Sequence, residues 1–105
     1  MKTFEINGRK YKSAKVDFNF ICDLEDMGIS VKDFRSKPMA VARAYFALCA
    51  GSDKDIAGSE IQAHMLKGGK LDELYEVLGK EIEESDFFQA LNKTEDEEVA
   101  TSKKK

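Results

Sequence analysis

The chain has few of the residues on which catalytic, metal-binding and disulfide-rich proteins depend. Its 105 residues include two cysteines, one histidine, one proline and no tryptophan. Cys22 and Cys49 form no CxxC pair, so the pattern disfavours a metal site and a disulfide, and we expect both thiols to be buried and inert. His64 has no nucleophile motif beside it, which favours a structural or exposed imidazole over a catalytic one.

Long apolar runs and an excess of positive charge are also missing. No run approaches the ~20 residues that a membrane-spanning helix needs, and the first residues lack a signal-peptide core. The net charge is −3, whereas broad nucleic-acid binding requires a basic face. We therefore expect no membrane and no nucleic acid among its partners, and a chain that stays in the compartment where it is made.

The usual motifs of catalysis and cofactor binding do not occur. The sequence contains no GxSxG, Walker A, GxGxxG, HExxH or EF-hand pattern. Carboxylates are numerous, but they follow helix-surface spacings and lack the apolar neighbours that would raise a pKa. The sequence thus predicts a protein that is not an enzyme and that holds no cofactor or metal.

What the sequence does contain begins with a hairpin signal. Asn7-Gly8 suits a type I′ turn, which needs two residues that tolerate positive φ. Closing the turn there pairs Phe4 with Tyr11 and puts Phe4, Ile6 and Tyr11 on one face. Because a lone two-stranded hairpin is marginal in water, we expect this apolar face to lie against helices.

Apolar residues recur at helical spacing in four later stretches. The predicted helices cover residues 18–27 after an Asp17 cap, 38–50 ending at Gly51, 60–67 after a Ser59 capping box, and about 70–84, with a capped single turn near 30–34. Ser85 offers a cap for a further turn or two. The 38–50 helix carries almost no charge and is expected to be central, whereas residues 52–58 are expected to form a loop or an irregular turn.

These elements predict an α+β fold, in which an N-terminal β-hairpin packs on a small bundle of four to five helices. Residues 1–92 are expected to form one folded domain. Residues 93–105 end in TEDEEVATSKKK, where charge comes in blocks and Val99 is the one large aliphatic residue. Such a segment cannot bury enough to offset its ordering entropy, so we expect a disordered charged tail.

The aromatic end of the predicted body carries the candidate partner-binding residues. Phe87, Phe88 and Leu91 form a bulky apolar patch, to which we add Tyr75 from the last long helix. Adjacent phenylalanines on a helix point about 100° apart. Either one ring packs inward while the other covers the hairpin, or the patch is an exposed anchor for a partner or another subunit.

Taken in order, several stretches resemble the tail assembly chaperones of long-tailed bacteriophages. They are KTFEINGRKYK, VDFNFICDLEDMGIS, AVARAYFALCAG and GGKLDELYEVLGKEIEESDFFQAL, within residues 2–92. The resemblance implies a protein without catalytic activity that works in the host cytoplasm and is absent from the finished virion. Its partners would be the tape measure protein, a very long helical chain that it keeps soluble, and the major tail tube protein, which it helps to recruit.

The resemblance also bears on the last three residues and on assembly. Genes of this family are often read in two ways, through a programmed frameshift near the end. The codons for Lys103–Lys105 would be rich in adenine and hence slippery, so our hypothesis is that this chain is the short form, with a plain lysine end as the alternative. The resemblance makes self-association plausible. A second interpretation, from another class, is a small acidic adaptor that binds a single folded partner.

Overall fold

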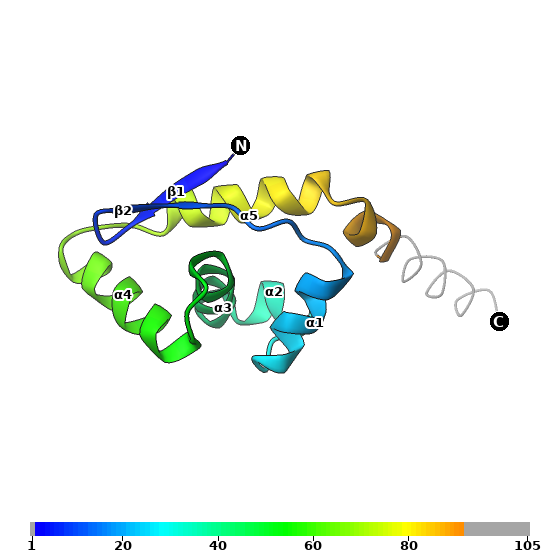
Figure 1. Cartoon of the computed structure of the whole chain (residues 1–105), viewed down its shortest axis with the longest axis horizontal. Coiled ribbons are helices and arrows are strands. Elements are labelled where there is room, and N and C mark those ends of the chain that lie inside the picture. The colour runs from blue at the N-terminus through cyan, green and yellow to red at the C-terminus, as the bar shows by residue number, and fades with distance from the viewer. Residues whose placement is uncertain (1, 92–105) are drawn as a thin grey trace.

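The computed structural model describes residues 2–91, and the predicted tail over 93–105 lies outside them. An antiparallel hairpin leads into a set of short helices, so the predicted α+β class is confirmed (Figure 1). Residues 86–91 add a last helical segment. The elements are β1 (Thr3–Ile6), β2 (Arg9–Lys12), α1 (Phe18–Asp26), α2 (Asp33–Ser36), α3 (Pro38–Ala50), α4 (Lys54–Leu66) and α5 (Asp72–Glu84).

The hairpin has the predicted turn and register. Asn7 and Gly8 take φ values of 52° and 81°, as a turn with two left-handed residues requires. Phe4 faces Tyr11 across the strands, and the side chains of Phe4 and Ile6 are buried. Alternation along β1 therefore gives the hairpin one apolar face, which needs a surface to cover it.

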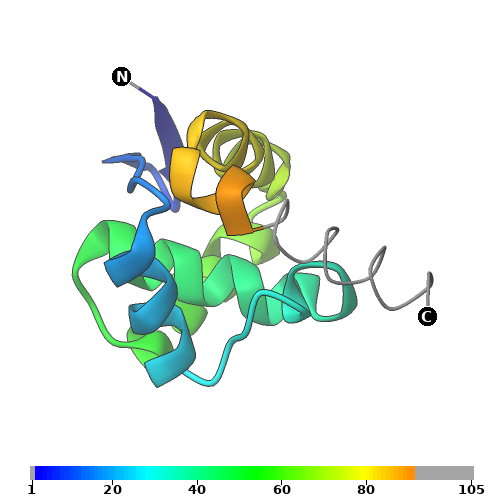
Figure 2. The same ribbon diagram turned by 90° about the vertical axis from the view of Figure 1, so that its right-hand side faces the viewer.

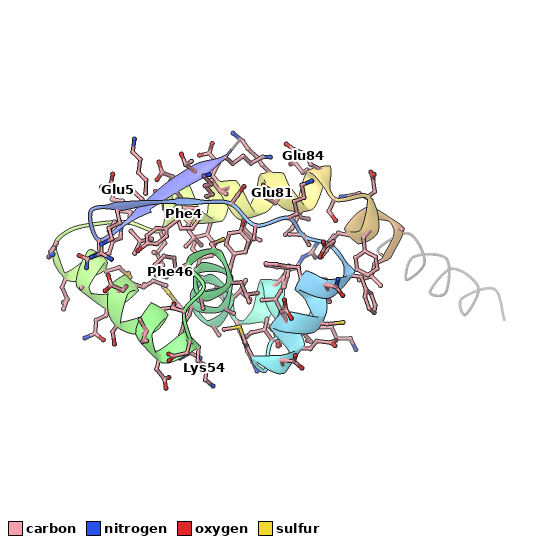
Figure 3. The ribbon with its side chains drawn as sticks, viewed as in Figure 1. Phe4, Glu5, Phe46, Lys54, Glu81 and Glu84 are labelled. Atoms are coloured by element: carbon pink, nitrogen blue, oxygen red, sulfur yellow. The ribbon has the colours of Figure 1, made fainter. Side chains whose placement is uncertain are left out.

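Helix α3 supplies that surface from the centre of the molecule. The hairpin and α5 lie on the same side of α3 in two perpendicular views (Figures 1 and 2), while α1, α2 and α4 also contact it. Phe4 and Phe46 meet edge to face with ring centroids 6.1 Å apart, between the hairpin and α3 (Figure 3). The buried Tyr45 donates its hydroxyl to the Ala14 carbonyl at 3.2 Å. The predicted central helix is thus the one on which the other elements pack.

Helix ends follow the local chemistry of the sequence. Asp17 caps α1 by accepting a hydrogen bond from the Phe20 amide at 2.9 Å. Pro38 occupies the first turn of α3, and Gly51 ends that helix with φ of 69°. After α5, the Ser85 hydroxyl accepts from the Phe88 amide at 3.0 Å and starts the helical residues 86–91. Asp17, Gly51 and Ser85 each pair a backbone group at a helix end, whereas Pro38 has no N–H to leave unpaired.

The expected loop over 52–58 and the Ser59 helix start are wrong. Asp53 accepts a hydrogen bond from the Ile56 amide at 2.8 Å, and α4 runs from Lys54 straight through Gly58. A Cβ atom at Gly58 would stand 3.2 Å from the Arg43 Cδ atom of α3. The glycine that suggested a break therefore allows the close approach of two helices, which local propensity does not reveal.

The expectation that the carboxylates lie on the helix surface fails at Glu81 of α5. Its residue is only 8% exposed, and it accepts a hydrogen bond from the Ser13 hydroxyl. The Lys2 ammonium lies 3.5 Å from Glu81 and 2.6 Å from Glu84, two acids that neighbour each other in Figure 3. Hydrogen bonding to Glu84 raises the pKa of Lys2. These contacts tie the start of the chain to the end of α5.

Candidate partner-binding groove

A groove with a volume of about 480 Å³ opens between α3 and α4. Most of its lining is apolar, and the buried Ile61 belongs to it. We call it the α3–α4 groove. Its lining residues are Met39, Ala40 and Arg43 of α3 and Gly58, Ile61, Gln62, Met65 and Leu66 of α4.

Exposed apolar side chains gather at this groove. Five large hydrophobic residues are exposed within residues 2–91, and three of them line it. Met39 is 61% exposed, Met65 is 43% exposed and Leu66 is 79% exposed. Methionine is unbranched and polarisable, so it adapts to differently shaped apolar partners. The groove therefore suits the apolar stripe of an amphipathic helix better than a small polar ligand.

One charged side chain lies among these apolar residues. Arg43 is half-buried, and within residues 2–91 its guanidinium has no ion pair and no hydrogen bond. Its aliphatic stem passes Gly58, where the lack of a side chain leaves it room. A long cationic side chain of this kind covers apolar surface with its stem and presents its charge to whatever enters the groove.

The structure divides the predicted aromatic patch between core and surface. Phe88 is 6% exposed and stacks on Phe34 with centroids 5.8 Å apart. Phe87 is half-buried and meets Phe18 edge to face at 5.6 Å, so it covers α1 and not the hairpin. Leu91 is also half-buried. Phe88 thus packs inward, as one of the two alternatives had it. Phe87 does not cover the hairpin as that alternative required, so partner binding by the patch stays a prediction.

Tyr75, the fourth predicted residue, belongs to neither part of that patch. It lies near the start of α5 and donates its hydroxyl to the Pro38 carbonyl at 2.7 Å. Partial burial raises the pKa of this phenol. Its ring thus fastens α5 to the first turn of α3. The apolar surface that Phe87 still offers is continued by Phe18, which is 60% exposed and which we did not predict.

His64 is held by the backbone on both sides. Its Nδ1 accepts a hydrogen bond from the Asn7 amide at 2.9 Å, and its Nε2 lies 3.0 Å from the Lys70 carbonyl oxygen. These partners assign a neutral ring with the proton on Nε2. A Cβ atom at Gly69 would approach the ring to 2.5 Å. His64 therefore links the hairpin turn to the α4–α5 connection.

Both cysteines are free and half-buried, where we expected full burial. Burial raises the pKa of the Cys49 thiol to about 11, although a hydrogen bond to Tyr45 opposes the rise. A thiol with so high a pKa is a poor nucleophile at neutral pH. Cys49 is therefore not a candidate reactive group.

Over residues 2–91, no three histidine, cysteine or carboxylate residues cluster as metal ligands would. In the same part of the chain, no helix combines the length and apolar character needed to cross a membrane. Comparisons with protein-family models, curated proteins and solved structures found no match. The α3–α4 groove is therefore the feature from which a function has to be inferred.

Sequence reasoning missed the groove because it grouped Ile61, Met65 and Leu66 as the apolar residues that the predicted 60–67 helix presents, without deciding which of them is exposed. A signal was nevertheless present along α4. Its large apolar residues, Ile56, Ile61, Met65 and Leu66, do not share one narrow stripe, and of these four only Ile61 is buried. A helix with more apolar directions than one core can cover leaves some of them for a partner.

Proposed function

We propose that the chain is a tail assembly chaperone of a long-tailed bacteriophage, which binds amphipathic segments of the tape measure protein in its α3–α4 groove. The observation that carries this proposal is the cluster of Met39, Met65 and Leu66, three exposed apolar side chains on one groove. The resemblance of the sequence to that family supplies the client, and the groove supplies a surface of suitable chemistry.

The size of the groove fits weak binding by each copy. Covering the exposed parts of its three apolar side chains is worth about 3–6 kcal/mol before any ordering cost. The costs of bringing the two partners together and of ordering them are subtracted from this gain, so each contact alone is weak. A long client with many such segments would still be covered, because neighbouring copies act together. Weak single contacts also allow the tail tube protein to displace the chaperone as the tube assembles.

In this proposal the protein acts by binding alone, in the host cytoplasm, and leaves before the virion is complete. Phe87, with the exposed Phe18 beside it, and Leu91 on the same helical segment as Phe87 offer a second apolar surface for the tail tube protein or for another copy of the chain.

Co-expression with the tape measure protein tests the proposal. The client is identified by sequencing the DNA around the gene, where a very long helical reading frame and an adenine-rich site at the Lys103 to Lys105 codons are expected. Wild-type protein should keep the client soluble. Leu66→Asp should abolish this effect, because it places a charge at the exposed end of the groove.

The matched control is Ile56→Asp on the same helix. Ile56 is 55% exposed but does not line the groove, so this variant should protect the client as well as wild type does. Both variants should melt close to wild type, since each side chain is largely outside the core. Equal client protection by Leu66→Asp and wild type would contradict the proposal. A one-to-one complex with a single folded partner would instead support the adaptor interpretation.

A further inference from the structure

Arg43 places a positive charge in the α3–α4 groove, so an occupant of the groove has to match a charge as well as the apolar side chains. The side chain is half-buried and has no ion pair or hydrogen bond within residues 2–91. We infer that Arg43 selects client helices that carry a carboxylate beside their apolar stripe. This inference deepens the proposed function and rests on it, because it concerns the same groove.

The requirement follows from what happens when a helix covers the groove. An apolar occupant would remove water from the guanidinium and offer no hydrogen-bond acceptor in its place, which is costly for a buried charge. A carboxylate on the occupant would accept two parallel hydrogen bonds from the planar guanidinium and so restore what water provided. Purely apolar helices are thus disfavoured at the same site that favours acidic amphipathic ones.

The positions of the lining residues set where that carboxylate lies. The Arg43 stem is beside Gly58, whereas Met65 and Leu66 stand at the other end of the groove along α4. At 1.5 Å per residue, Gly58 and Leu66 are about 12 Å apart along the helix. An occupant that seats apolar residues against Met65 and Leu66 and runs along α4 therefore meets Arg43 about two helical turns away.

Selection from a library of helical peptides tests this inference, because it samples many arrangements of charged and apolar residues at once. Peptides of about 15 residues, displayed on yeast, would be selected against the full chain and against Arg43→Met and Arg43→Glu. Arg43→Met is the matched control because it keeps an apolar stem beside Gly58 and removes only the charge. Circular dichroism melting confirms that each variant is folded.

With wild type, recovered peptides should carry Asp or Glu about two turns from a pair of apolar anchors. That enrichment should disappear with Arg43→Met and change to Lys or Arg with Arg43→Glu. For one recovered peptide, replacing its acid by the amide should weaken binding about tenfold to wild type and less than about twofold to Arg43→Met. These results would support the inference.

Three results would overturn it, and they are distinguishable. Recovery of the same peptides by all three proteins would show that Arg43 selects nothing, while the groove remains the binding site. Recovery of the same peptides by wild type and by Leu66→Asp would show that the groove is not the site, which removes the proposed function as well. If sedimentation showed self-association that Leu66→Asp abolishes, the occupant would be a second copy, and the inference would again fail.

Discussion

Replacing each of the adjacent phenylalanines by alanine should have very different effects on stability. Phe88 is 6% exposed and stacks on Phe34, and truncation of a buried phenylalanine costs about 3–5 kcal/mol. We take the lower end, about 3 kcal/mol, because its stacking partner Phe34 is itself only half-buried. For a domain of this size, that lowers the melting temperature by roughly 12–24 °C.

Phe87→Ala is the matched control. Phe87 is half-buried and its ring contacts the exposed Phe18, so its removal should cost only about 1 kcal/mol and lower the melting temperature by roughly 4–8 °C. Differential scanning calorimetry measures both variants under the same conditions. Equal losses, or a larger loss for Phe87→Ala, would refute the assignment of Phe88 to the core. A small loss for both, with fast amide exchange over 86–91, would show that this segment opens independently of the body.

Four further predictions concern contacts within the body. Gly69→Ala should destabilise the fold by about 1–3 kcal/mol in urea titrations, because its Cβ would displace His64. The control Gly79→Ala, which has open space around it, should instead stabilise the fold by about 0.5–1 kcal/mol. Glu81→Ala should cost about 1–3 kcal/mol, since Glu81 is buried and its loss leaves the half-buried Ser13 hydroxyl without its acceptor. A cost no greater than that of Glu84→Ala, whose side chain is exposed, would contradict this. Iodoacetamide should alkylate Cys49 about a hundredfold more slowly at pH 8 than an ordinary thiol, because the pKa of Cys49 is raised to about 11. Mass spectrometry of the Cys22→Ser variant, in which Cys49 is the one remaining cysteine, measures this rate. The folded state keeps the Cys49 proton at a pH where the unfolded chain has lost it, so the free energy of unfolding should fall as the pH rises from about 8.5 toward 11, as urea titrations at several pH values would show.

The features predictable from the sequence were those decided by neighbours in the chain. Asn7-Gly8 determined the hairpin register, and Asp17, Pro38 and Gly51 marked helix ends, because each acts on backbone groups a few residues away. The sequence pattern also identified 38–50 as the central helix, since a helix with almost no charge has to be covered on most sides.

The features that the sequence could not supply depend on contacts between distant elements. Gly58 suggested a break between helices, but in the structure it lies inside α4 and leaves room for Arg43 of α3. Glu81 looked like a surface acid until Ser13 and Lys2 were found to hold it. Met65 stands four residues after the core residue Ile61, a spacing that puts both on one helix face, yet it is 43% exposed. Periodicity identifies apolar directions on a helix, but only the packed structure decides which of them a neighbour covers.

The tie between Lys2 and Glu84 has a consequence for the order of events during synthesis. The two residues are 82 positions apart. At 5–20 residues per second, a ribosome therefore adds Glu84 about 4–16 s after it has added Lys2. A hairpin closes within about 10 μs but is marginal alone. The strands made first therefore expose Phe4 and Tyr11 for seconds, until α3 and α5 exist to cover them. Under the proposed function, this protein protects another chain from aggregation, and its own apolar strands are exposed in the same way while it is being made.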